Sequence, residues 1–170
     1  ALTHRSFAYE FGGLPTNERL EFLGDSVLGL IITEALYERF PDLDESRLSP
    51  LRSGIVNMRA LATIARELEL GAALKIGKGE EVTGGRDKNS ILADAFEALV
   101  GAIYLDHGFA KTTEIVMRLM KSAIDEALSR GAGLDGKTAL QEIVAASGWQ
   151  PPEDRKSTRL NSSHVSESRM

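Results

Sequence analysis

The segment of the sequence that most restricts the fold is ILADAFEALVGAIYL, residues 91–105. Its residues are apolar nearly all round a helix, which is typical of a central helix buried on every side. Its only charged residues are Asp94 and Glu97, which lie one helical turn apart. A buried carboxylate is costly unless it is paired, protonated or bound to a metal. The chain therefore has to build a helical core around two acidic groups.

A second acidic pair lies in NERLEFLGDS, residues 17–26. Here Asn17 is placed to cap an amphipathic helix, and residues three or four positions apart share one face of such a helix. Glu21 and Asp25 therefore lie in line with the apolar positions that should face the core. The pattern places two more carboxylates at the start of a core-facing stripe.

Two explanations account for these four acids. Each could find a basic partner from elsewhere in the chain, for example Arg52 or Arg86. Alternatively, the acids could share a divalent cation, since Mg²⁺ prefers a few carboxylate oxygens together with waters and phosphate oxygens. One acidic pair favours the first explanation, but two pairs favour the metal. A metal would also let a protein of net charge −5 approach a polyanion, because the bound ions invert the local charge.

The helical period predicts an all-α main domain. No convincing run of alternating strand residues is found, and the glycine-rich stretch 71–90 is predicted to be a loop. Gly108 and Gly131 are expected to stop the last two helices, and Asn57 is expected to cap the third. The predicted helices cover residues 17–39, 46–56, 57–70, 91–107 and 112–130.

Composition restricts the classes of site and the location. The chain has no cysteine, which excludes disulfides and thiolate metal sites and suits a reducing cytosol. The apolar runs are too short to span a bilayer, so we expect a cytoplasmic protein with no membrane partner. The three histidines, His4, His107 and His164, have no paired metal-ligand spacing, and we expect each to be a surface or capping residue.

The sequence resembles the bacterial ribonuclease III family over residues 1 to about 152. The motifs that carry the resemblance are NERLEFLGDS (17–26), ALTHRSFA (1–8), SPLRSGIVN (49–57), IARELELG (64–71) and KNSILADAFEALVGAIYLD (88–106). The resemblance implies the helical ribonuclease III endonuclease-domain fold and a homodimer with one site per subunit. It also implies Mg²⁺-dependent cleavage of double-stranded RNA in the processing of ribosomal RNA precursors and mRNA. The products would carry 5′-phosphate and 3′-hydroxyl ends.

The resemblance assigns roles to the acids. It implies that Glu21, Asp25, Asp94 and Glu97 form the metal-binding cluster, with Asp25 and Glu97 as catalytic residues and Mn²⁺ able to replace Mg²⁺. In the family such a metal activates a water and stabilises the leaving 3′ oxygen.

Three further positions match family residues outside the metal cluster. Glu18 and Glu45 match acids near the RNA and the dimer interface. Phe22 matches an aromatic residue that packs across the dimer interface. The alternative function is a catalytically inactive dimerisation and RNA-binding module of the same fold, which would be expected to have lost one or more of the four acids. A hydrolase of small phosphorylated metabolites is disfavoured because it needs neither the dimer nor the RNA signature.

The domain organisation is predicted as a catalytic domain, truncated at its N-terminus, in residues 1–130 and a linker in residues 131–136. KTALQEIVAASGWQPP, residues 137–152, resembles the first helix and turn of a double-stranded-RNA-binding domain. The sheet and second helix of such a domain do not follow. Residues 153–170 are serine-rich and without period, and we expect a disordered, non-native tail.

Overall fold

The computed structural model describes residues 1–129, which belong to the first of the two units of the chain, Ala1–Ala132. The predicted linker 131–136, the helix and turn 137–152 and the tail 153–170 lie outside the described residues. Within residues 1–129 the fold is all-α, as predicted, and the one pairing of extended backbone is a parallel bridge between Thr3 and Lys75. The elements are α1 (Arg5–Glu10), α2 (Glu18–Arg39), α3 (Glu45–Ile55), α4 (Met58–Glu67), α5 (Leu70–Ala73), α6 (Lys78–Val82), the 3₁₀ helix η1 (Gly85–Asp87) and α7 (Asn89–Leu119).

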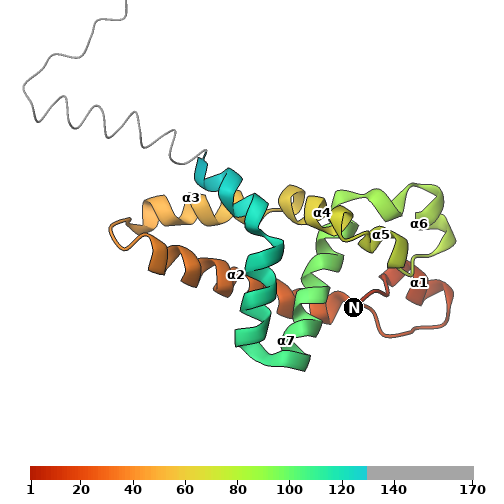
Figure 1. Cartoon of the computed structure of the whole chain (residues 1–170). Helices are drawn as coiled ribbons and strands as arrows, with labels where there is room; N and C mark the ends of the chain where they lie inside the picture. Colours follow the sequence, from red (N-terminus) through yellow and green to blue (C-terminus); the bar gives the residue numbers. More distant parts are fainter. Residues whose placement is uncertain (130–170) are drawn as a thin grey trace, which may run out of the picture. The chain divides into compact units, whose positions relative to one another are not determined.

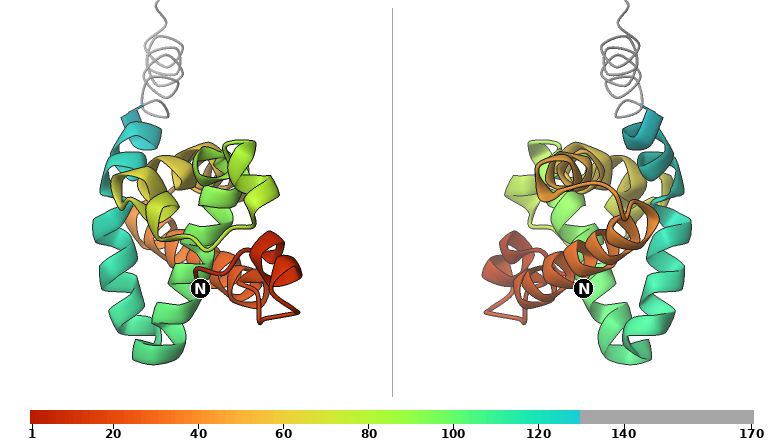
Figure 2. Two further views of the ribbon diagram at one scale, coloured as in Figure 1. Left: turned by 90° about the vertical axis from the view of Figure 1, so that its right-hand side faces the viewer. Right: turned by 90° about the vertical axis from the view of Figure 1, so that its left-hand side faces the viewer.

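Helix α7 is the centre of the domain, and it contains the buried segment predicted from the sequence (Figure 1). Gly108 interrupts it with φ 73° and ψ −179°, a left-handed backbone that glycine adopts without strain. The chain reverses direction at this point, so the two halves of α7 run side by side (Figures 1 and 2). The predicted stop at Gly108 is confirmed. The predicted helix 112–130 is broken at Met120, after which residues 121–129 are helical again.

The core forms where α2 and α4 pack against α7. Leu28 and Ile32 of α2 and Leu92 and Phe96 of α7 are at most 1% exposed. Burying a side chain of this size contributes about 1.5–3 kcal/mol. These apolar residues therefore fix the position of the two helices that carry the four acids.

The third predicted helix begins where the sequence indicates and ends earlier. The Asn57 side chain accepts a hydrogen bond from the backbone N–H of Ala60 (3.0 Å), so its capping role is confirmed. Helix α4 ends at Glu67, and Glu69 has a positive φ of 54°. The continuous helix predicted to residue 70 is wrong for this reason.

The glycine-rich stretch 71–90 is not the simple loop that the sequence predicts, because α6, η1 and most of α5 form there. Two side chains, one from α1 and one from the segment itself, support these short helices. The Glu10 carboxylate of α1 accepts from the backbone N–H of Lys78 (3.0 Å) at the start of α6. The Arg86 guanidinium donates to the carbonyls of Gly71 (2.9 Å) and Leu74 (2.7 Å). Local composition cannot reveal contacts of this kind.

The extended segment before α1 joins three parts of the domain. Its backbone pairs with Lys75 on one side, through Leu2 and His4, and Thr3 accepts a hydrogen bond from the N–H of Asn17 (2.9 Å) on the other. The start of the chain is therefore attached both to the α5–α6 connection and to the beginning of α2. None of the helices in residues 1–129 is long and apolar enough to cross a membrane.

Candidate metal centre

Three of the four predicted acids meet where α2 crosses α7. Glu21, Asp94 and Glu97 each offer a carboxylate oxygen, and these oxygens all lie within 4.8 Å of one another. All three side chains are partly buried. Oxygen ligands around one Mg²⁺ lie at about 2.1 Å from the ion, so small side-chain rotations would place the three oxygens on a single ion. We call these three residues the acid cluster.

Two glycines allow the helices to come this close. A Cβ atom at Gly24 of α2 would lie 1.8 Å from the carbonyl oxygen of Glu97. A Cβ atom at Gly101 of α7 would lie 2.3 Å from the carbonyl oxygen of Leu20. Any larger residue at either position would push the helices apart. The separation of Glu21 from Glu97 is therefore set by backbone contact.

Burial and mutual repulsion favour protonation of the cluster. Burial, followed by the charges of Asp25, Asp94 and Glu21, raises the pKa of Glu97 to about 7. Burial also raises the pKa of Glu21 and of Asp94. Carboxyl groups whose charged forms are disfavoured in this way are a suitable ligand set for a divalent cation, because the cation removes the repulsion.

Basic side chains do not neutralise the cluster directly. Within residues 1–129, no lysine or arginine forms an ion pair with any of its three acids. Arg5 is the arginine whose charge lowers the pKa of both Glu21 and Asp94, but it pairs with Glu18 (3.5 Å). Arg86, a candidate partner from the sequence, pairs with Glu81 (2.7 Å). The donor set therefore fits a metal better than a network of ion pairs.

Asp25 lies outside the acid cluster, although the sequence predicts one group of four acids. It follows Glu21 by four residues, which is about 6 Å further along α2, and its side chain is exposed. Among the charged groups, Asp25 nevertheless has the largest effect in raising the pKa of Glu97. Asp25 lines an open hollow of about 510 Å³ that Arg52 also lines. Asp25 is thus placed at the solvent side of the site.

The remaining predicted residues lie on the surface. Glu18 is exposed beside the cluster and accepts a hydrogen bond from Thr16 Oγ (2.9 Å). Glu45 is the first residue of α3 and is exposed. Phe22 is 78% exposed, which is unusual for a phenylalanine in a helix that contributes to the core. The roles of these three residues at the RNA or the dimer interface stay predictions.

Sequence reasoning missed Gly24, Gly101 and a contribution from His4. The signal for the two glycines was available, since a glycine inside a helical pattern usually has a packing reason. For His4, the expected capping role is confirmed, because its Nδ1 accepts from the N–H of Ser6. Its effect on the pKa of Asp94 depends on the tertiary fold and has no local signal.

The sequence model of the Ribonuclease-III-like family matches residues 1–123. The chain belongs to this family. It is 61% identical over 153 residues to the ribonuclease 3 of Thermobifida fusca, covering 90% of this chain and 64% of that protein. It is 60% identical over 153 residues to the ribonuclease 3 of Streptomyces coelicolor, covering 90% of this chain and 55% of that protein. The chain therefore spans somewhat more than half the length of these ribonuclease III relatives.

Solved structures of the family agree with the fold. One crystal structure of the nuclease domain of ribonuclease III from Campylobacter jejuni superposes with a TM-score of 0.66 at 45% identity, covering 71% of this chain and 80% of that chain. A second structure of that domain gives a TM-score of 0.68 at 44% identity, covering 73% and 84%. Its description names a flexible region involved in dimer formation. The likeness establishes the ribonuclease III nuclease-domain fold for this chain.

Proposed function

We propose that this chain carries the nuclease domain of an endoribonuclease that cleaves double-stranded RNA by Mg²⁺-assisted phosphodiester hydrolysis, with Mn²⁺ able to replace Mg²⁺. The observation that carries the proposal is the acid cluster itself. Carboxylate oxygens of three acids from two core helices lie within 4.8 Å of one another, and Asp25 is exposed one turn further along α2. Membership of the ribonuclease III family supports the choice of RNA as substrate.

In this proposal the partly buried acids bind the metal and the exposed acid orients the attacking water. Glu21, Asp94 and Glu97 hold the metal, and bound Mg²⁺ would supply Lewis acidity toward phosphate oxygens and lower the pKa of the attacking water. Asp25, at the exposed side of Glu97, is placed to accept a hydrogen bond from that water and orient it. The products are a 5′-phosphate and a 3′-hydroxyl end.

We further propose that the active form is a homodimer in which Phe22 contacts the partner subunit. Two sites facing one duplex would make staggered cuts, as the family resemblance implies. Ribosomal RNA precursors and mRNA are the proposed cellular substrates, and a cytoplasmic location stays a prediction. The alternative of an inactive RNA-binding module is disfavoured because all four acids are present.

Incubation of the full chain with long duplex RNA at low salt tests the proposal. We expect cleavage that requires Mg²⁺ or Mn²⁺ and leaves single-stranded RNA of the same sequence largely intact. Glu97→Ala should abolish cleavage. Absence of metal-dependent cleavage, or equal cleavage by the wild type and Glu97→Ala, would contradict the nuclease function.

A further inference from the structure

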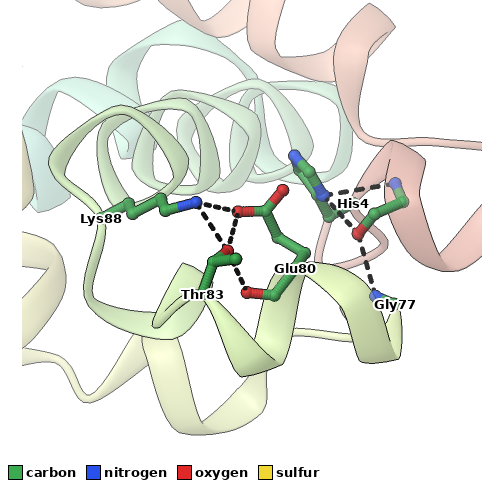
Figure 3. A network of polar contacts seen from close by, with 6 residues as sticks. His4, Gly77, Glu80, Thr83 and Lys88 are labelled. Carbon is green, nitrogen blue, oxygen red and sulfur yellow. Dashed lines mark hydrogen bonds and ion pairs between the residues drawn. The ribbon is translucent and has the colours of Figure 1, made fainter.

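An open hollow of about 480 Å³ lies where α1 contacts the beginning of α6. Side chains of both signs line it, namely Arg5 of α1 and the acids Glu10 and Glu80. His4 also lines the hollow, and Figure 3 shows the polar contacts that His4 and Glu80 make. A hollow with a cation in its wall is suited to an anion only where other groups neutralise its acids.

Both acids of the hollow are engaged by donors of the chain itself. The Glu80 carboxylate accepts a hydrogen bond from Lys88 Nζ (2.6 Å) (Figure 3), and this contact holds the pKa of Glu80 below its ordinary value. The Glu10 carboxylate accepts from the backbone N–H of Lys78 (3.0 Å). Within residues 1–129, neither acid pairs with Arg5. The positive charge of Arg5 is therefore not cancelled inside the hollow.

One acid of α2 holds Arg5, and it holds it loosely. Nη1 of Arg5 lies 3.5 Å from Oε1 of Glu18, and the two side chains are 72% and 51% exposed. In the described part of the chain the guanidinium forms no hydrogen bond. Exposed ion pairs of this kind contribute little to stability. A ligand with more suitable oxygen atoms can therefore replace Glu18 as the partner of Arg5.

The contact with Glu18 places Arg5 beside the acid cluster. Glu18 precedes Glu21 by three residues, so the two share one face of α2 and lie about 4.5 Å apart along the helix axis. The backbone agrees with this placement, because Thr3 accepts a hydrogen bond from the N–H of Asn17 (2.9 Å), directly before α2. The charge of Arg5 also acts to lower the pKa of Glu21. Arg5 thus lies about one helical turn from a proposed metal ligand.

The phosphates of an RNA strand match this arrangement. Arginine presents its N–H donors in a planar fork that binds two oxygens of one phosphate at once, whereas a single ion-pair contact joins Arg5 to Glu18. Successive phosphates of one duplex strand are about 3.4 Å apart along the duplex axis. When the scissile phosphate lies at the acid cluster, a phosphate one or two nucleotides away therefore comes within reach of Arg5.

We propose that Arg5 is a substrate-binding residue, whose guanidinium leaves Glu18 and binds an RNA backbone phosphate one or two nucleotides from the scissile phosphate. This inference rests on the proposed cleavage of double-stranded RNA. In the free protein, Glu18 keeps the guanidinium at the edge of the metal centre and competes with RNA for its N–H groups. A phosphate contact carries no base information, so Arg5 fixes the position of the strand and not the sequence that is cleaved.

Equilibrium binding of a long RNA duplex to the full chain, in a chelator that prevents metal-dependent cleavage, measures this contact. We expect Arg5→Gln to bind about 10-fold more weakly than the wild type at low salt. The slope of log K against log salt should become smaller by about one for each Arg5 in contact. Arg5→Lys should keep most of the slope, because the charge is retained. Arg118→Gln is the matched control, since this exposed arginine lies in the second half of α7, and it should bind like the wild type.

Glu18→Gln distinguishes a contact with RNA from a structural ion pair. If Arg5 and Glu18 only support the fold as a pair, Arg5→Gln and Glu18→Gln should both lower the thermal midpoint and both weaken RNA binding. If Glu18 competes with RNA for Arg5, Glu18→Gln should bind the duplex more tightly than the wild type. That gain should be smaller when Arg5→Gln is also present.

The results separate this inference from the proposed function. Equal affinities and salt slopes in Arg5→Gln and Arg118→Gln, or weaker RNA binding by Glu18→Gln, would overturn the role of Arg5, while Mg²⁺-dependent cleavage by the wild type would still support the nuclease. With Mg²⁺, Arg5→Gln should need more enzyme to reach half of its maximal single-turnover rate, with the maximal rate and the Mn²⁺ affinity near those of the wild type. A wild type that does not cleave duplex RNA with Mg²⁺ would reject the nuclease function, and with it the placement of Arg5 beside a scissile phosphate.

Discussion

Gly24 of α2 lies against the carbonyl oxygen of Glu97 on α7, so closely that a Cβ atom at Gly24 would be 1.8 Å from that oxygen. Glu97 is also the member of the acid cluster whose pKa is raised furthest, to about 7. The same backbone contact that lets the helices cross therefore places a carboxylate where burial and repulsion oppose its charge. Helix packing and metal-site geometry are set at one point of the structure.

Substitution of Gly24 tests this coupling. In Gly24→Ala the added methyl group must displace α7, and overpacking of this kind costs about 1–3 kcal/mol. We expect a lower free energy of unfolding in denaturant and a loss of Mn²⁺ binding. Gly29→Ala is the matched control in the same helix, since a Cβ atom there meets nothing within 4 Å. The control should keep metal binding and gain about 0.5–1 kcal/mol in stability from helix propensity. Equal behaviour of the two variants would show that the close crossing does not matter.

The raised pKa of Glu97 predicts how stability depends on pH without metal. Between the ordinary value of 4.5 and about 7, the folded state keeps a proton that the unfolded chain has lost. The free energy of unfolding should therefore fall as pH rises through this window. Glu97→Gln cannot ionise and should show a flatter pH profile, with higher stability than the wild type at pH 8. Thermal unfolding from pH 5 to pH 8 in a chelator measures both curves, and parallel curves would refute the prediction.

Metal addition should reverse that pH dependence. The cation competes with protons for the same carboxylates, so it binds more strongly at pH 8 than at pH 6. At a free Mg²⁺ concentration of about 100 times Kd the native state gains about 2.7 kcal/mol. We expect the thermal midpoint of the wild type to rise with Mg²⁺, more at pH 8 than at pH 6, and that of Glu97→Gln to rise far less. A Mg²⁺ effect of the same size in Glu97→Gln would place the binding elsewhere.

The helices could be predicted from the sequence where their apolar residues recur regularly and their ends carry local signals. Asn57 caps α4 and Gly108 interrupts α7 as predicted, because a cap and a positive φ depend on nearby backbone. The segment 71–90 could not be predicted. Its short helices depend on Glu10, which is distant in the sequence and contacts Lys78. They also depend on Arg86, which bonds to Gly71 at the other end of the same segment.

The sequence indicates which acids to expect at the site but not how they are arranged. Asp94 and Glu97 could be predicted because charged residues are costly on a buried helix. Glu21 and Asp25 could be predicted because helical spacing places them on a core-facing stripe. Whether Asp25 joins the other three depends on how far along α2 the crossing with α7 lies. That position is set by Gly24 and Gly101, and neither periodicity nor charge reveals it.

Because Asp25 is exposed and lies outside the acid cluster, we expect its substitution to impair catalysis without weakening metal binding. Asp25→Asn should keep Mn²⁺ binding near the wild-type level, because the cluster of Glu21, Asp94 and Glu97 remains complete. It should also lower the pKa of Glu97, since the largest charge effect on that group is removed. Duplex-RNA cleavage should nevertheless fall by about 100-fold or more, as expected for loss of a residue that orients the attacking water. Calorimetry with Mn²⁺ and a single-turnover cleavage assay measure the two effects. Loss of Mn²⁺ binding equal to that of Glu97→Gln would show instead that Asp25 is a direct ligand.

Substitution of Phe22 tests whether the proposed homodimer forms through the exposed face of α2. Its side chain is 78% exposed and lies next to Glu21 in sequence, so a partner packed there would also restrict the surroundings of the metal centre. Truncating a buried aromatic anchor at an interface costs about 2 kcal/mol or more, which is about a 30-fold weaker dimer. We expect Phe22→Ala to shift the monomer–dimer equilibrium by this amount in sedimentation velocity at micromolar concentration. Tyr9→Ala is the control, because Tyr9 is 90% exposed on α1 and has no predicted interface role. An unchanged equilibrium in Phe22→Ala, or an equal shift in both variants, would remove Phe22 from the proposed interface.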